Sequence, residues 1–164
     1  MKKSKLFEGQ KAPTFIASST AGEFNLECLE EKWLVFYFYS KDLTAGCTIE
    51  AKGFSELINE FKKLDVKVIG ISRDTLSSHE RFIETECINF DLISDSQEML
   101  CKEYGVCIDK TMLGNRYSDF ERTTFLIDRN KIIRRIWKKV FPSGHAAKVL
   151  ETIKILNMVK INPL

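Results

Sequence analysis

The sequence lacks any apolar run of the roughly 18 residues that a membrane span needs, and its net charge is only +2. The first absence argues against an integral membrane protein. The second argues against a protein that binds nucleic acid or an anionic membrane. The basic segment Met1–Lys5 is not followed by an apolar stretch, so no secretory signal is expected.

Cysteine and histidine are scarce and irregularly spaced. The five cysteines form no Cys-x-x-Cys pair, which argues against a disulfide framework or a zinc site and favours free thiols in a reducing cytoplasm. We therefore expect no metal and no cofactor, and we expect Cys28, Cys101 and Cys107 to be packing or incidental thiols. The two histidines, His79 and His145, are expected to be helix residues rather than catalysts, so a cysteine hydrolase has no placed base.

The remaining composition is that of a globular chain. Apolar residues make up 44% of the 164 residues, charged residues make up 29%, and twelve Phe supply packing volume. This length is sufficient to bury a substantial core. We expect a single domain over residues 1–164.

Strand and helix patterns alternate along the chain, with turn residues between them. The expected elements are a hairpin over 13–26, a buried strand at Trp33–Tyr39, a helix from near Cys47 to about Leu64, a strand at Val66–Ser72, a helix over 76–87, a strand at Phe90–Ile93, a short helix at Gln97–Tyr104, a hairpin of Thr123–Ile127 and Ile132–Trp137, and a last helix from Ser143 or Gly144. This order predicts an α/β protein of the thioredoxin-like fold, with a central mixed sheet flanked by helices and an N-terminal hairpin.

Cys47 lies where the buried strand turns into the following helix. The first N–H groups of a helix have no intrahelical partner, and the helix dipole favours an anion there. Such a turn favours the thiolate form of cysteine, which is the nucleophilic form. The sequence therefore predicts a reactive sulfur at this position.

Four motifs together resemble those of the peroxiredoxins. They are Phe36-Tyr37-Phe38-Tyr39, Thr44-x-Gly46-Cys47-Thr48-x-Glu50-Ala51, Gly70-Ile71-Ser72 and Arg122-x-Thr124-Phe125-Leu126-Ile127-Asp128. The chain is most similar to the bacterioferritin comigratory protein subfamily, the Q-type peroxiredoxins, over nearly its full length. The resemblance implies a peroxidase that reduces hydrogen peroxide and organic hydroperoxides through a cysteine sulfenic acid. It also implies recycling by thioredoxin or by a glutathione/glutaredoxin-type thiol, in a monomer or weak homodimer.

The resemblance also implies roles for individual residues. Cys47 is the expected nucleophile, and the Thr44 hydroxyl is expected to accept the peroxide proton and to donate to the sulfur or to the breaking bond. Arg122 is expected to hold the thiolate and the developing negative charge with its planar, permanently charged group. Glu50 lies three residues after Cys47, and two interpretations stay open: it orients Arg122, or it is an ordinary carboxylate of the first turn.

Three positions depart from the family pattern. Ser40 stands where a proline usually helps to shield the cysteine pocket, and Ala45 replaces a frequent proline in the turn. Lys52 occupies the position of a second cysteine that many members carry five residues after the first. The usual intrahelical disulfide therefore cannot form.

Cys87 is a candidate for resolving the sulfenic acid. Some members place the resolving cysteine at the position of Ile83, and Cys87 lies one turn further along the same helix face. Its position on an apolar stripe with Leu76 and Phe82 is equally typical of a buried packing thiol. A one-cysteine mechanism with an external thiol, or resolution by Cys101 or Cys107, also stays open.

Other functions fit the sequence less well. A thiol–disulfide oxidoreductase of this fold would carry Cys-x-x-Cys at the turn, and a cysteine phosphatase would carry an arginine just after Cys47. The serious alternative, because of Ser40 and Lys52, is a catalytically weak or non-enzymatic thioredoxin-fold redox sensor or interaction module.

Overall fold

The computed structural model describes residues 6–161, and the basic segment Met1–Lys5 in the expectation about a secretory signal lies outside this range. Seven strands form a mixed sheet in the order β2-β1-β5-β4-β3-β8-β9, and β6 and β7 form a separate hairpin. The elements are β1 (Ile16–Ser19), β2 (Gly22–Asn25), the 3-10 helix η1 (Leu26–Cys28), β3 (Trp33–Phe38), α1 (Ala45–Glu56), α2 (Ile58–Lys63), β4 (Val66–Ser72), α3 (Leu76–Glu86), β5 (Asp91–Ser94), α4 (Met99–Glu103), β6 (Cys107–Met112), β7 (Asn115–Phe120), β8 (Thr123–Asp128), β9 (Ile133–Trp137) and α5 (His145–Ile161). Strands β3, β4 and β5 are parallel, whereas β8 runs antiparallel to β3. The predicted mixed sheet and N-terminal hairpin are confirmed.

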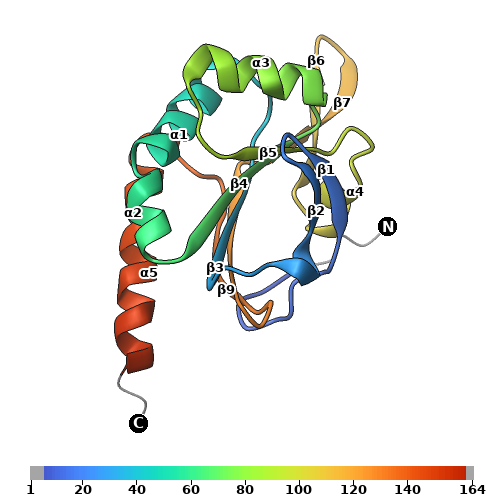
Figure 1. The fold of residues 1–164 in the computed structure, drawn as a ribbon. Coiled ribbons are helices and arrows are strands. Elements are labelled where there is room, and N and C mark those ends of the chain that lie inside the picture. The colour runs from blue at the N-terminus through green and yellow to red at the C-terminus, as the bar shows by residue number, and fades with distance from the viewer. Residues whose placement is uncertain (1–5, 162–164) are drawn as a thin grey trace.

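The central strand β3 is buried on both faces, as predicted from its continuous apolar run. Because successive side chains of a strand point to opposite faces, its odd and even residues enter two different cores. Trp33, Val35 and Tyr37 share a core with residues of α1, α2, α3 and α5, whereas Phe36 and Phe38 share the other with α4 and the N-terminal segment. Figure 1 shows α1, α2 and α5 along one side of the sheet and α4 on the other.

The expected long helix after Cys47 is two helices. Leu57 ends α1 and precedes α2, with backbone angles φ −100° and ψ 5°. After this break the two helices cover different surfaces, since α1 packs against α5 and α2 packs against β4. Among residues 6–161, no helix is both long enough and apolar enough to cross a membrane.

The β6–β7 hairpin was not predicted. Its first strand is largely exposed on both faces, so it has no alternation of buried and exposed residues to mark it. Leu113 and Gly114 form its turn, both with positive φ (51° and 81°), which is the geometry of a type I′ turn. The usual Asn-Gly or Asp-Gly pair is absent from the turn, so the sequence carries no strong signal for this hairpin.

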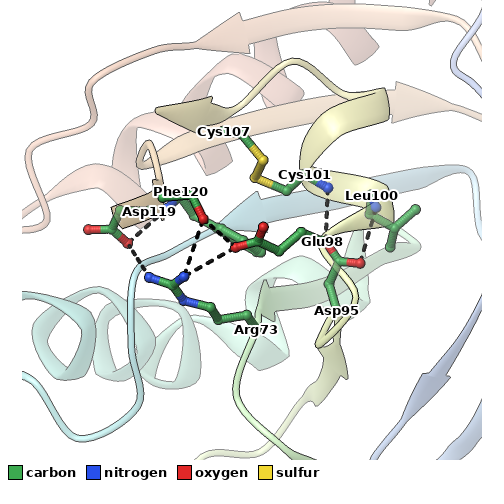
Figure 2. The surroundings of a disulfide bond; sticks show 9 residues. Arg73, Asp95, Glu98, Leu100, Cys101, Cys107, Asp119 and Phe120 are labelled. Atoms are coloured by element: carbon green, nitrogen blue, oxygen red, sulfur yellow. Dashed lines mark hydrogen bonds and ion pairs between the residues drawn. A yellow bond between two sulfur atoms is a disulfide. The ribbon is translucent and has the colours of Figure 1, made fainter. Parts of the chain in front are cut away.

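A disulfide joins Cys101 of α4 to Cys107 at the start of β6 (Figure 2). The expectation that these two residues are packing or incidental thiols is wrong. Helix α4 ends in a turn in which Gly105 has φ 70° and the N–H of Val106 donates to the Cys101 carbonyl. This turn brings the two Cα atoms within 5.2 Å, inside the range that a disulfide spans.

Candidate active site

Cys47 is the third residue of α1, directly after the loop that leaves β3. The first intrahelical bond, from the N–H of Thr48 to the carbonyl of Thr44, is 2.9 Å long. The N–H groups of the first residues of a helix have no partner in the helical ladder, and Cys47 lies in this first turn. Cys47 is only 2% exposed. The predicted strand–turn–helix placement of this cysteine is confirmed.

Arg122 lies between β7 and β8, and its guanidinium connects two residues of α1. Its Nη2 donates to Cys47 Sγ at 3.3 Å, and its Nη1 donates to Glu50 Oε1 at 2.8 Å. The antiparallel register pairs Thr123 with Phe38, the last residue of β3. Arg122 precedes Thr123 and therefore lies near the carboxyl end of β3, from which the chain continues to α1. A planar group with several fixed N–H donors can serve both partners at once.

Glu50 is buried, with 1% of its surface exposed, and its carboxylate is held by Arg122. Burial raises its pKa from 4.5 to about 7, although Arg122 acts in the opposite direction. Of the two interpretations left open by the sequence, the contact with Arg122 matches the orienting one. Glu50 and Cys47 thus face the same cation from the same helix.

Gly46 gives the guanidinium room to approach the sulfur. A Cβ atom at this position would lie 3.2 Å from Arg122 Nη2 and 3.4 Å from Cγ of Pro142. The first distance is shorter than ordinary van der Waals contact, and the second is at its lower limit. A side chain at this position would therefore force Arg122 Nη2, which contacts Cys47, to shift by a few tenths of an ångström.

Thr44 precedes α1 as its N-cap residue, but its side chain makes no capping bond. It is exposed, and its hydroxyl donates to the carbonyl of Lys41 at 2.8 Å. A hydroxyl has one proton to donate and two lone pairs that accept. In this arrangement Thr44 is free to accept a proton, whereas donation to Cys47 requires its hydroxyl to rotate.

Residues 8–136 match the AhpC/TSA family. The chain belongs to this family. A putative peroxiredoxin Bcp of Coxiella burnetii is 43% identical over 143 residues, which cover 87% of this chain and 95% of that protein. Peroxiredoxin Bcp of Escherichia coli is 36% identical over 147 residues, which cover 89% and 94%. The resemblance found in the sequence is confirmed.

Solved structures of Bcp and PrxQ proteins are similar in fold to this chain. The bacterioferritin comigratory protein of Xanthomonas campestris, described with its alkyl peroxide reduction activity, has a TM-score of 0.81 and 37% identity, covering 87% of this chain and 91% of that one. A PrxQ mutant of Xylella fastidiosa has a TM-score of 0.88 and 33% identity, covering 94% and 99%. The thioredoxin-like fold and the peroxidase function are therefore confirmed. This chain is a peroxiredoxin, an enzyme that reduces a peroxide at the expense of a thiol.

Asp42 holds the loop of this peroxiredoxin that carries Thr44, and sequence reasoning missed it. Its buried carboxylate accepts from the hydroxyls of Tyr39 at 2.6 Å and Ser78 at 2.8 Å. Its backbone N–H donates to Asp74 Oδ2 at 2.9 Å. These bonds fix the loop in which Ser40 replaces the family proline. No local signal marks Asp42, because most of its partners lie more than 30 residues away.

His79 completes this network inside the protein. Its Nδ1 lies 2.7 Å from Asp42 Oδ2, and its Nε2 lies 2.9 Å from the carbonyl oxygen of Ile93. The Tyr39 hydroxyl lies 3.3 Å from the same Nδ1, so the ring joins Asp42, Tyr39 and the β5 backbone in one hydrogen-bonded network. His145 is the first residue of α5, and burial lowers its pKa to about 4, which leaves it neutral at pH 7. The expectation that both histidines are helix residues is confirmed.

Cys87 directly follows α3, as its C-cap residue with φ 54°, and it is exposed. The interpretation of Cys87 as a buried packing thiol is therefore wrong. The neighbouring Glu86 forms an ion pair with Lys52 of α1 at 3.7 Å, and Asn89 donates to the carbonyl of Ser55 at 3.3 Å. The chain on either side of Cys87 thus contacts α1 at Lys52 and Ser55, which follow Cys47 by five and eight residues.

A hollow of about 650 Å³ lies at the other end of the sheet. Its lining includes Asp65 and Val66, where β4 begins, and Ile58 of α2, but not Cys47 or Arg122. Cys47 follows the carboxyl end of β3, which is parallel to β4, so the two sites lie at opposite ends of these strands. The hollow is therefore separate from Cys47 and Arg122.

Proposed function

We propose that Cys47 is the nucleophile with which this peroxiredoxin reduces hydrogen peroxide and organic hydroperoxides. The single observation that carries the assignment is the 3.3 Å contact between Arg122 Nη2 and Cys47 Sγ. A cation within hydrogen-bond distance of a buried sulfur stabilises the thiolate, which is the form that reacts.

The reaction is a displacement at oxygen. The thiolate attacks one peroxide oxygen, the O–O bond breaks, and the other oxygen leaves as hydroxide or alkoxide and takes up a proton. Sulfur is oxidised to sulfenic acid while the peroxide is reduced to water or an alcohol. Arg122 faces the charge as it moves from sulfur to the leaving oxygen, and the N–H groups at the start of α1 add further donors.

Thr44 and Glu50 support this step in different ways. The lone pairs of the Thr44 hydroxyl can accept the proton of the incoming peroxide, because its own proton is donated to Lys41. Glu50 fixes the guanidinium through the 2.8 Å bond to Nη1, which leaves Nη2 directed at the sulfur. Glu50 is thus a positioning residue, and it does not touch the reacting atoms.

We further propose that Cys87 resolves the sulfenic acid. Its thiolate would attack Cys47 Sγ and release water, forming a disulfide that thioredoxin or a glutathione/glutaredoxin-type thiol then reduces. A disulfide requires Cα atoms within about 7 Å. The first turns of α1 must therefore unwind before the two sulfurs meet. An external thiol acting directly on Cys47 is the competing route, and we propose a monomer or weak homodimer for either route.

The nucleophile is tested by peroxide consumption with a dithiol donor. Cys47→Ser should abolish turnover, whereas Cys28→Ser, at another exposed cysteine outside the site, should retain it. Retention of most activity by the Cys47 variant would contradict the assignment.

The resolving step is tested by peptide mapping after one equivalent of peroxide. A linked Cys47–Cys87 peptide is expected in the wild type and in Cys28→Ser, and it should be lost in Cys87→Ser. A sulfenic acid or a glutathione adduct that persists on Cys47 in the wild type would show instead that an external thiol resolves it.

A further inference from the structure

The Cys101–Cys107 disulfide lies on the other face of the sheet from Cys47. Cys101 belongs to the core that contains Phe36 and Phe38, whereas Cys47 belongs to the core beneath α1 and α5. Cys101 is fully buried, and Cys107 is half-buried. A dithiol reagent can therefore approach this bond only from the Cys107 side.

The disulfide fixes the base of the hairpin that leads to Arg122. Cys107 stands directly opposite Phe120 in the β6–β7 pairing. Beside this pair, the N–H of Glu121 donates to the carbonyl of Val106 at 2.7 Å. Arg122 is the next residue after Glu121. The bond to Cys101 thus anchors to α4 the strand pair from which the cation of the active site emerges.

A polar cluster next to the disulfide holds the same hairpin (Figure 2). Arg73 Nη1 lies 3.1 Å from Glu98 Oε1, and Arg73 Nη2 lies 3.8 Å from Asp119 Oδ1 of β7. The hydroxyl of Ser118 donates to Glu98 at 2.6 Å. Arg73 is followed by Asp74, whose carboxylate holds the loop that carries Thr44. The surroundings of the disulfide therefore contact both segments that build the active site.

We propose that Cys101–Cys107 is a second, reversible redox centre, whose disulfide form anchors Arg122 for reaction at Cys47 and whose dithiol form loosens it. A peroxidase that is recycled by thiols meets both an oxidant and a reductant, so both states of a reachable disulfide are accessible. The inference rests on the proposed roles of Cys47 and Arg122.

Both half-reactions balance with reactants that the activity supplies. In reduction, a dithiol attacks Cys107 Sγ, Cys101 leaves as a thiolate and takes up a proton, and the second thiol of the reagent releases Cys107 as its own disulfide forms. In oxidation, a hydroperoxide oxidises the Cys107 thiolate to sulfenic acid and is itself reduced to alcohol or water. Cys101 then attacks that sulfur and releases water.

The redox activity is tested without the peroxidase site, in a variant that carries Cys28→Ser, Cys47→Ser and Cys87→Ser. Under native conditions, with the fold monitored by circular dichroism, it should show no free thiol, then two after treatment with dithiothreitol, and none again after hydrogen peroxide. Thiols that appear only in denaturant, or that do not reoxidise, would show that the bond is purely structural and would overturn the proposal.

The coupling to Arg122 is tested by the single-turnover rate of Cys47 with hydrogen peroxide. Cys101→Ala/Cys107→Ala should react about threefold or more slowly than wild type with the disulfide intact, which is within the range of couplings between residues in one network. Cys28→Ser should equal wild type. In an Arg122→Lys background the double replacement should have no further effect.

The outcomes separate this inference from the proposed function. Equal rates with and without the disulfide, or the same decrease in the Arg122→Lys background, would overturn the coupling to the active site. If Cys47 did not react with peroxide at all, the proposed function would fail, while the thiol titration would still decide whether Cys101–Cys107 is redox-active.

Discussion

The proposed active site contains one cation that is shared by two residues of the same helix. Arg122 reaches Cys47 and Glu50 with different nitrogens, and Gly46 provides the space for this approach. Each of these residues can be changed with a definite expectation, because the contacts are short and the site is largely buried.

Gly46→Ala should slow the reaction of Cys47 with peroxide several-fold, corresponding to about 1 kcal/mol of transition-state stabilisation. The added methyl group would displace Arg122 Nη2 from its position 3.2 Å away. The matched control is Gly53→Ala in the same helix, where the methyl group would meet only Cβ of Ala146 at 3.6 Å. This control should keep the rate and gain about 1 kcal/mol in stability, since alanine favours a helix interior. Equal rates for both variants would contradict the steric role of Gly46.

Glu50 should make stability decrease as pH rises. Its pKa is 4.5 in its ordinary state and about 7 in the folded protein, because burial disfavours the charged form. Between these values the folded state binds more protons than the unfolded state, so the stability present below pH 4.5 is lost as pH rises through 7. At about 1.4 kcal/mol per pKa unit, the loss amounts to roughly 3 kcal/mol.

The measurement is urea unfolding of wild type and Glu50→Gln between pH 4.5 and 8. The variant cannot ionise, so its stability relative to wild type should increase across this range. A constant difference between the two proteins would show that Glu50 titrates alike in both states.

At the scale of elements, the loop between β3 and α1 is held by the buried hydrogen bonds of Asp42 rather than by a proline. Asp42→Asn replaces a carboxylate oxygen, which accepts from Tyr39, Ser78 or His79, with an amide group that donates. Leaving a buried donor without its acceptor costs about 1–3 kcal/mol. Asp109→Asn, at an exposed aspartate of β6, is the control and should change stability little. Thermal unfolding measures both, and an Asp42 variant as stable as the control would contradict the role of Asp42 in holding the loop.

The elements around Cys47 could be predicted because their causes are local. The apolar run of β3, the turn and the apolar spacing of α1 lie within 30 residues of each other. The contact between Arg122 and Cys47 spans 75 residues, and the resemblance to peroxiredoxins, not any spacing, identified it. The Cys101–Cys107 bond could not be inferred from cysteine counting, because it depends on the turn after α4.

At the scale of the whole molecule, the sheet separates two sulfur centres. Cys47 of α1 belongs to the core on one face, Cys101 of α4 belongs to the core on the other, and the β6–β7 hairpin leads from Cys107 toward Arg122. Figure 1 shows α1 and α4 on different sides of the sheet. Arg122 thus connects the two centres, because it follows the hairpin that the disulfide anchors and it contacts Cys47.

The most direct test is the second-order rate of Cys47 with hydrogen peroxide in Arg122→Lys. Lysine keeps the charge but loses the planar fork that serves Cys47 and Glu50 together. We expect a decrease of about tenfold or more, corresponding to about 1.4 kcal/mol. Arg116→Lys, at an exposed arginine of β7, should leave the rate unchanged. An Arg122→Lys variant as fast as wild type would contradict the central claim that Arg122 activates Cys47.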